Sequence, residues 1–107
     1  MSRLQGKRIV ITGSSRSLGR EFALALAREG ASVIINGTNE EALLATQQEI
    51  EKLGARVVAV AGSVADSGTC KQLIQTCVEQ FGGIDVLVNN AGIVRDRTLL
   101  KMSDEDF

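Results

Sequence analysis

The strongest constraint on this chain is a regular alternation of two hydrophobic patterns. Continuous runs of β-branched and aliphatic residues occupy positions 8–12, 32–36, 56–60 and 84–89, about 25 residues apart. Such runs are typical of strands buried on both faces, and the segments between them are long enough for helices. Strict alternation of strand and helix implies a parallel sheet with right-handed connections and helices on both faces.

The predicted fold class is therefore α/β: a three-layer, Rossmann-like doubly wound parallel sheet, present as its N-terminal half with strand order 3-2-1-4. One domain is expected over residues 1–107, because this length suits a single compact unit. The fourth strand would be an exposed sheet edge. We therefore expect the chain to be cut before the second half of the fold, and to form a homo-oligomer, a dimer, through that edge.

Three helices are predicted between the strands, each closed by glycine, which ends a helix without strain in the left-handed region. Their predicted limits are Ser17 to Glu29 closed by Gly30, a helix capped by Thr38 or Asn39 and closed by Gly54, and one capped by Asp66 and stopped by Gly82-Gly83. Ser103 and Asp106 form a capping box, which predicts the start of one more helix.

Helical spacing also predicts which residues of these helices form the apolar stripes. They are Leu18, Phe22, Ala25 and Leu26 in the first helix, Leu43, Leu44, Ile50 and Leu53 in the second, and Cys70, Leu73, Ile74, Cys77, Val78 and Phe81 in the third. Cys70 and Cys77 are seven residues apart, so we expect them to share one buried face as small core residues in a reducing compartment.

Composition excludes several classes of function. The formal net charge of −1 gives no basic field for nucleic acid or anionic lipid, and no apolar run is long enough to span a membrane. The N-terminus lacks the apolar core of a signal peptide, so a cytoplasmic location is expected. The chain contains no histidine, which excludes His-based general-base and nucleophilic triads and most catalytic zinc sites.

The loop between the first strand and the first helix has the pattern of a nucleotide-binding turn. Gly13 permits a tight turn, and Gly19 permits close packing of the helix on the sheet. A helix N-terminus at this place offers free N–H groups to phosphate. Ser17 stands where the backbone approaches the pyrophosphate most closely, and its Cβ takes up space there. Glycines that serve only the turn are the competing interpretation, and the missing Gly-Lys-Ser/Thr disfavours a P-loop NTPase.

The end of the second strand indicates which nucleotide is bound. NAD-selective sites carry an acidic residue there for the ribose 2′-hydroxyl, whereas this chain has Asn36-Gly37-Thr38. Arg16, in the loop, has the planar geometry that suits a 2′-phosphate, although it also fits an exposed, solvated side chain. The missing acid and the added base together favour NADP(H) over NAD(H).

Two motifs taken together carry a family resemblance. With "TGSSRSLG" at residues 12–19 and "LVNNAG" at 87–92, the chain resembles the short-chain dehydrogenase/reductase family. The run "NNAGIVRDRTLLKMSDEDF" from Asn89 to Phe107 is most similar to the 3-oxoacyl-[acyl-carrier-protein] reductases. The resemblance extends from the first strand to the end of the chain.

This resemblance implies a set of cofactor-binding residues, with Asn89 mainly holding the central sheet. The set comprises Gly13, Ser15, Arg16, Ser17, Leu18 and Gly19 in the loop, Asn36, Gly37 and Thr38 after the second strand, Ser63 and Val64 after the third, and Asn90, Ala91 and Gly92 after the fourth. Ser63 replaces an aspartate that touches the adenine amino group in the family. Ser17 and Ser63 are thus two departures on the cofactor side, consistent with an NADP(H) site that binds more weakly.

The resemblance places catalysis outside this chain. The family's Tyr-x-x-x-Lys, in which the tyrosine protonates the substrate carbonyl, lies downstream of the position of Phe107, and this chain has no tyrosine. We therefore assign no catalytic or metal-binding residue. The expected role is the cofactor-binding part of a reductase of 3-oxoacyl thioesters, with a small-molecule or carrier-bound acyl substrate.

Other interpretations stay open on the sequence alone. One is a non-catalytic remnant that binds nucleotide or associates with itself, and a more distant one is a methyltransferase with an adenosyl cofactor. Arg95, Arg97 and Lys101 form a small basic cluster. A solvated face balanced by Asp96 and Asp104 is favoured over docking of an acidic carrier protein.

Overall fold

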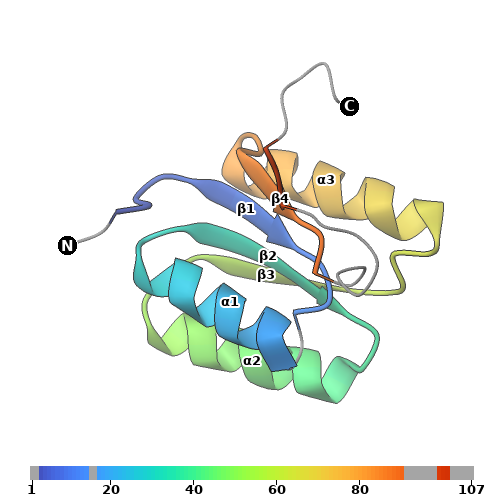
Figure 1. The fold of residues 1–107 in the computed structure, drawn as a ribbon, viewed down its shortest axis with the longest axis horizontal. Helices are drawn as coiled ribbons and strands as arrows, with labels where there is room; N and C mark the ends of the chain where they lie inside the picture. The colour runs from blue at the N-terminus through green and yellow to red at the C-terminus, as the bar shows by residue number, and fades with distance from the viewer. Residues whose placement is uncertain (1–2, 15–16, 91–98, 102–107) are drawn as a thin grey trace.

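The computed structural model describes residues 3–14, 17–90 and 99–101. A five-stranded sheet in the order β3-β2-β1-β4-β5 forms the centre of the molecule (Figure 1). Along the chain the elements are β1 (Arg8–Ile11), α1 (Ser17–Arg28), β2 (Ser32–Gly37), α2 (Glu40–Lys52), β3 (Val57–Ala61), α3 (Ser67–Phe81), β4 (Val86–Val88) and β5 (Leu99–Lys101).

The first four strands confirm the predicted doubly wound half-sheet. β1 pairs in parallel with β2 on one side and with β4 on the other, and β3 pairs in parallel with β2. This gives the order 3-2-1-4 expected from the alternation of patterns.

The prediction that the fourth strand is an exposed edge is wrong. β5 pairs antiparallel with β4, so that Val88 lies opposite Leu99 and Val86 opposite Lys101. An antiparallel return needs no crossover helix, so a short segment suffices to cover the edge. The predicted dimer was to form through an unpaired β4 edge, and β4 is paired with β5, so this reason for dimerisation no longer holds. Homo-oligomerisation itself stays a prediction. The capping box at Ser103 and Asp106 lies outside the described residues.

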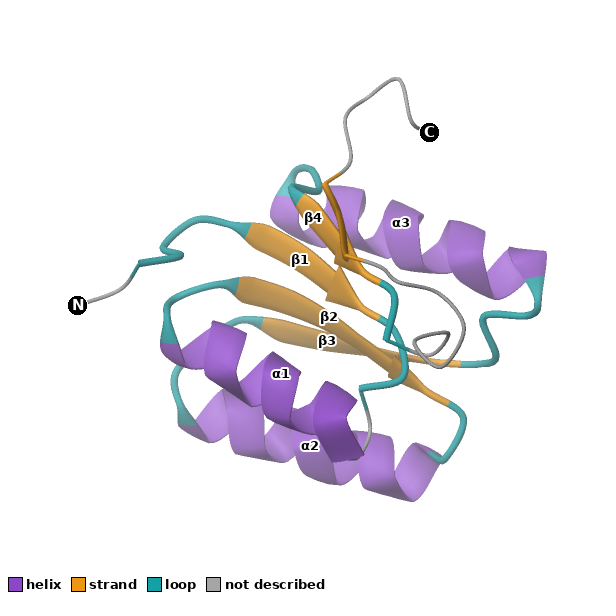
Figure 2. Cartoon of the chain, in the orientation of Figure 1, coloured by secondary structure: helices purple, strands orange, loops and turns teal. Residues whose placement is uncertain are grey.

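Helices cover both faces of the sheet, as expected (Figure 2). α1 and α2 pack on one face and α3 on the other. Alternate residues of β1 face opposite layers: Ile9 and Ile11 join the cluster under α1 and α2, whereas Val10 packs with Leu73 and Cys77 of α3. The apolar strand runs of the sequence are explained by this two-sided burial.

The predicted face of α1 is wrong in part. Leu18 and Phe22 are 57% and 39% exposed, while Ala23, Leu24 and Ala27 are buried against the sheet. The small side chains of Ala23 and Ala27 allow α1 to approach the sheet closely, and Leu24 fills the contact beside them, while Leu18 and Phe22 lie outward.

The other two helices also depart from the predicted stripes. In α2, Leu44 is exposed, as is Leu53 directly after its end, and the buried positions are Leu43, Thr46 and Ile50. In α3, Cys77 is buried but Cys70 is exposed, so the two thiols do not share a buried face. Cys70 lies in the first turn of α3, where it lines a small hollow instead of facing the sheet core.

Capping side chains hold the starts of α2 and α3. The side-chain oxygen of Asn39 accepts a hydrogen bond from the backbone N–H of Ala42, which identifies Asn39, not Thr38, as the cap. Asp66 caps α3 by accepting from the N–H of Gly68, and Gly82 closes that helix in the left-handed region, both as predicted. In the part of the chain that the structure describes, no helix combines the length and apolarity needed to cross a membrane.

An ion pair joins β1 to β4 at the amino ends of the strands. The Arg8 guanidinium donates to both carboxylate oxygens of Asp85 at 2.9 and 3.0 Å, and the Arg8 backbone N–H donates to Asp85 at 2.8 Å. The hydrogen bonds from Arg8 lower the pKa of Asp85 to about 2.

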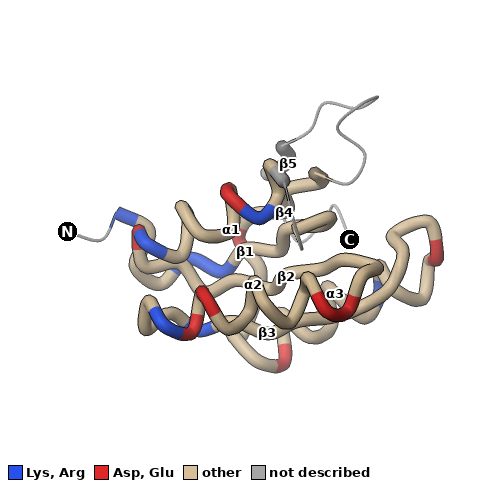
Figure 3. The backbone as a smooth tube through the Cα atoms, turned by 90° about the horizontal axis from the view of Figure 1, so that it is seen from below, with Lys and Arg blue, Asp and Glu red and all other residues tan. Residues whose placement is uncertain are grey.

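Elsewhere basic and acidic positions occur in the same elements (Figure 3), as in α2, which begins with Glu40 and Glu41 and ends with Lys52.

Candidate nucleotide-binding site

The candidate site lies at the carboxyl ends of β1, β2, β3 and β4. In the strand order, β2 and β4 lie on opposite sides of β1, so the order of the strands along the chain changes direction at β1. Ligands of doubly wound sheets bind at such a change of direction. The loop after β1 leads from Thr12 to the start of α1 at Ser17, where the helix offers its free N–H groups.

Two asparagines hold opposite sides of Gly13. The side-chain oxygen of Asn36, in β2, accepts from the Gly13 N–H at 3.2 Å. The side-chain nitrogen of Asn90, just after β4, donates to the Gly13 carbonyl oxygen at 3.1 Å. Gly13 has φ of +61°, a conformation that other residues rarely adopt. The turn is thus fixed through both of its peptide groups.

The structure shows why the second glycine of the motif, Gly19, is needed. A Cβ atom at this position would lie 2.5 Å from the side-chain nitrogen of Asn90 and would overlap the Gly13 carbonyl. Only glycine lets the first turn of α1 lie against this loop. The predicted roles of Gly13 and Gly19 in the turn and in close packing agree with this geometry.

Ser14 and Asn36 form a buried polar pair beneath the loop. The exposed fractions of Ser14 and Asn36 are 0% and 2%. The Asn36 backbone N–H donates to the Ser14 hydroxyl oxygen at 2.8 Å, and the Ser14 backbone N–H donates to the Asn36 carbonyl at 2.6 Å. The Ser14 hydroxyl donates to the Ile11 carbonyl at 2.8 Å. Sequence reasoning missed Ser14, because a serine inside a loop motif carries no sign of burial.

The Asn89-Asn90 pair divides between two tasks. Asn89 accepts from the Thr12 hydroxyl at 3.1 Å and so ties β4 to the end of β1, in line with its predicted structural role. The side-chain oxygen of Asn90 is buried and has no hydrogen-bond partner among the residues that the structure describes. Its orientation is set by the amide nitrogen, which must face the Gly13 carbonyl. A buried acceptor without a donor is costly unless a ligand or another group supplies one.

Ser63 and Val64 lie in the turn between β3 and α3. The Ser63 hydroxyl oxygen accepts from the Ala65 N–H at 3.1 Å, and its carbonyl accepts from the Asp66 N–H at 3.0 Å. Val64 lines a hollow of about 150 Å³ together with Thr12, Cys70, Leu73, Ile74, Leu87 and Asn89. Ser63 therefore shapes the loop beside the site through its own turn.

The structure brings most of the predicted cofactor residues to one edge of the sheet. These are Gly13, Leu18, Gly19, Asn36, Gly37, Thr38, Ser63, Val64 and Asn90. Ser15, Arg16, Ala91 and Gly92 lie outside the described residues, as does the side chain of Ser17, whose backbone opens α1. Contact of each of these residues with a cofactor stays a prediction. Across the described part of the chain, no cluster of three His, Cys, Asp or Glu side chains could hold a metal ion.

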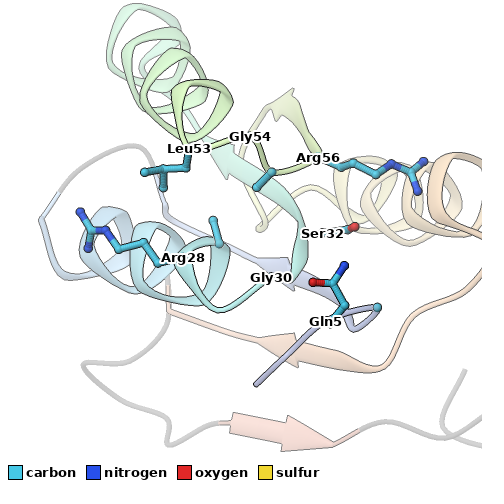
Figure 4. A pocket seen from close by; sticks show the side chains of 10 residues that line it. Gln5, Arg28, Gly30, Ser32, Leu53, Gly54 and Arg56 are labelled. Carbon is cyan, nitrogen blue, oxygen red and sulfur yellow. The ribbon is translucent and has the colours of Figure 1, made fainter. Parts of the chain in front are cut away.

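A larger hollow of about 370 Å³ lies at the opposite edge, near the amino ends of β2 and β3. Figure 4 shows the guanidinium groups of Arg28 and Arg56 directed away from each other in its wall. Arg56 donates to the Gln80 carbonyl at 2.6 Å and stacks on the Phe81 ring. This hollow therefore does not present a pair of converging cations, and none of the predicted site residues lines it.

Comparison with known proteins identifies relatives of the whole described fold. The family model for short chain dehydrogenase matches residues 7–107. The 3-oxoacyl-[acyl-carrier-protein] reductase FabG of Staphylococcus aureus is 44% identical, over 94% of this chain and 42% of that protein. The peroxisomal multifunctional enzyme type 2 of Drosophila melanogaster is 40% identical, over 98% of this chain and 19% of that protein. The chain thus spans less than half the length of these relatives.

Solved structures agree with the sequence comparison. A short chain dehydrogenase from Burkholderia cenocepacia, in complex with NADP, has a TM-score of 0.81 and 40% identity over 98% of this chain and 43% of its own. L-sorbose reductase from Gluconobacter frateurii, complexed with NADPH and L-sorbose, has a TM-score of 0.79 and 36% identity over 95% of this chain and 39% of its own.

Proposed function

Because the chain belongs to the short-chain dehydrogenase family, we propose that it is the cofactor-binding portion of an NADP(H)-dependent oxidoreductase. The observation that carries this proposal is the Gly13 turn, held by Asn36 and Asn90 at the N-terminus of α1. Such a turn at a helix start suits a phosphate group. Two relatives of known structure, one bound to NADP and one to NADPH, support the choice of cofactor.

The residues present fit a dinucleotide. Glycine at position 19 keeps the loop close to the helix start, and the buried Asn90 oxygen offers an acceptor that still lacks a donor among the described residues. The end of β2 has no acidic side chain at Asn36, Gly37 or Thr38 to select the 2′-hydroxyl of NAD. In this proposal Arg16 meets the 2′-phosphate, and the backbone at positions 90–92 borders the cofactor.

The proposed reaction is reduction of a 3-oxoacyl thioester to the 3-hydroxyacyl form. When bound, the nicotinamide supplies hydride to the keto carbon. Within this chain, Asn36 and Asn90 hold the phosphate-binding turn at Gly13, and Gly19 lets α1 lie against it. No tyrosine is present to supply the proton, so we propose that the 107-residue chain by itself binds nucleotide without turnover. The substrate class rests on similarity to the 3-oxoacyl reductase of Staphylococcus aureus.

Fluorescence of reduced nicotinamide tests this proposal directly. Titration of the chain into NADPH is expected to shift and enhance the emission, and addition of an acetoacetyl thioester is expected to leave NADPH unconsumed. Absence of any NADPH binding would overturn the assignment as a cofactor-binding portion. Steady NADPH oxidation would overturn the proposal that the proton donor lies outside the chain.

A further inference from the structure

We propose that Asn36 is a positioning residue, which sets the phosphate-binding turn through the protein interior instead of contacting the nucleotide with its side chain. The inference deepens the proposed function and rests on it. Asn36 lies at the carboxyl end of β2, where a side chain pointing outward would meet the adenosine ribose. Yet the residue is only 2% exposed.

The hydrogen bonds of the Asn36 carboxamide are directed to the protein itself. Its nitrogen donates to the carbonyl oxygens of Val60 and Gly62, both at 3.0 Å. Its oxygen accepts from the Gly13 N–H at 3.2 Å. A carboxamide has two N–H donors, so none remains for a ribose hydroxyl or a phosphate.

These contacts tie two loops of the site to one side chain. Gly13 belongs to the loop after β1, while Val60 and Gly62 lie at the end of β3, next to Ser63 and Val64. The Asn36 backbone adds two bonds to Ser14, one through its N–H and one through its carbonyl. The predicted phosphate and adenine sides of the site are thus held at one relative position by β2.

An amide is the only side chain that meets this demand. The position needs two donors for two carbonyls and one acceptor for an N–H, within the reach of a single methylene. Aspartate offers no donor when ionised and would face the Val60 and Gly62 carbonyls with negative charge. Alanine leaves the Gly13 N–H and the Val60 and Gly62 carbonyls without this side-chain partner, and the bond to Val60 is fully buried.

The test compares Asn36→Ala and Asn36→Asp with Ile34→Val in the 107-residue chain. Ile34 is fully buried on the same strand but belongs to the apolar cluster under α3, so its variant lowers stability without altering the loop. NADP⁺ affinity is measured by calorimetry well below the unfolding temperature. We expect Asn36→Ala to weaken NADP⁺ binding about tenfold or more, as for loss of a buried hydrogen bond whose partner is left unsatisfied. Ile34→Val is expected to bind like the original chain.

The pH profile of Asn36→Asp distinguishes positioning from general destabilisation. At this buried position, facing the Val60 and Gly62 carbonyls, the pKa of an aspartate carboxyl is raised. Its protonated form regains one donor, so the ratio of variant to original dissociation constant should fall as the pH is lowered from 8 to 5. The same ratio for Ile34→Val should stay constant. Binding of Asn36→Ala within about twofold of the original chain, or a flat Asn36→Asp ratio, would overturn the proposal.

Hydrogen exchange of the Gly13 amide tests, without nucleotide, whether the Asn36 side chain holds the turn. We expect faster exchange at Gly13 in Asn36→Ala and unchanged exchange in Ile34→Val. If neither the original chain nor any variant binds NADP⁺, the proposed function fails. The Gly13 exchange rate still shows whether the Asn36 side chain holds the Gly13 amide. Unchanged exchange at Gly13 in Asn36→Ala would contradict it.

Discussion

Asn36 and Asn90 bind the two peptide groups of Gly13. The Asn36 side-chain oxygen accepts from the Gly13 N–H at 3.2 Å, and the Asn90 side-chain nitrogen donates to the Gly13 carbonyl at 3.1 Å. Asn36 lies in β2 and Asn90 lies just after β4, the two strands on either side of β1. The turn that opens toward the helix start is therefore held by the sheet itself. Substitutions that disturb this arrangement should change nucleotide binding before they change the rest of the fold.

Gly19→Ala adds only one methyl group, yet it is expected to disrupt the nucleotide site. The added Cβ would lie 2.5 Å from the Asn90 side-chain nitrogen and overlap the Gly13 carbonyl, so either α1 or the loop must move. We expect a loss of about 1–3 kcal/mol in the free energy of unfolding, the usual cost of overpacking, together with loss of NADPH binding. Urea unfolding and NADPH fluorescence measure the two effects.

Gly68→Ala is the matched control for that substitution. Gly68 lies in the first turn of α3, and the atom nearest to an added Cβ is the Asp66 carboxylate oxygen at 3.2 Å. This oxygen accepts the capping bond from the Gly68 N–H, and a shift of a few tenths of an ångström relieves the contact while that bond is kept. Its stability should change little, because the higher helix propensity of alanine offsets the close contact. Equal losses in the two variants would contradict the packing role of Gly19.

Ser63→Asp is expected to restore the adenine contact of the family without disturbing the turn. The Ser63 hydroxyl oxygen accepts from the Ala65 N–H, and an aspartate oxygen can accept the same bond. NADPH binding should therefore tighten while the unfolding midpoint stays close to the original. Unchanged or weaker NADPH affinity, measured by fluorescence titration, would show that the serine is already suited to the base.

The Arg8–Asp85 ion pair predicts a dependence of stability on acid. Hydrogen bonds from Arg8 lower the pKa of Asp85 from 3.8 to about 2 in the folded protein. Because the folded pKa is the lower one, the pair contributes stability above pH about 4 and loses it as the pH falls toward 2. The gap in unfolding temperature between the original chain and Asp85→Asn should narrow over this interval. A constant gap from pH 6 to pH 2 would count against the ion pair as its source.

The two cysteines are expected to react at very different rates. Cys70 is exposed, whereas Cys77 is buried, and burial raises the pKa of the Cys77 thiol to about 11. A thiol reagent should therefore modify one group quickly in the native chain and both after denaturation. Mass spectrometry of digested protein locates the first site, and modification of Cys77 first would contradict the fold around α3.

The sheet was predictable because its signal is local. Each strand is a continuous apolar run, and the parallel order follows from the helix-length crossovers. The pairing of β5 with β4 was not predictable, because three residues at Leu99–Lys101 carry no pattern of their own. The face of α1 was assigned to the stripe of Leu18, Phe22, Ala25 and Leu26, yet close approach to the sheet buries Ala23, Leu24 and Ala27.

The candidate site was predictable as a position and not as a set of contacts. The glycines and the Asn89-Asn90 pair mark the carboxyl edge of the sheet. The inward direction of the Asn36 side chain depends on Val60 and Gly62, which are 24 and 26 residues away in the sequence. Such distant partners become visible only once the strands are paired.

Nucleotide selectivity tests most directly whether this chain forms the NADP(H)-binding portion of a short-chain oxidoreductase. Dissociation constants of NADP⁺ and NAD⁺ should be measured by calorimetry on the same preparation of the chain. We expect NADP⁺ to bind about tenfold or more tightly, since a charge-assisted contact to the 2′-phosphate is present in one complex only. Equal affinity for the two nucleotides, tighter binding of NAD⁺, or no binding of either would contradict the claim.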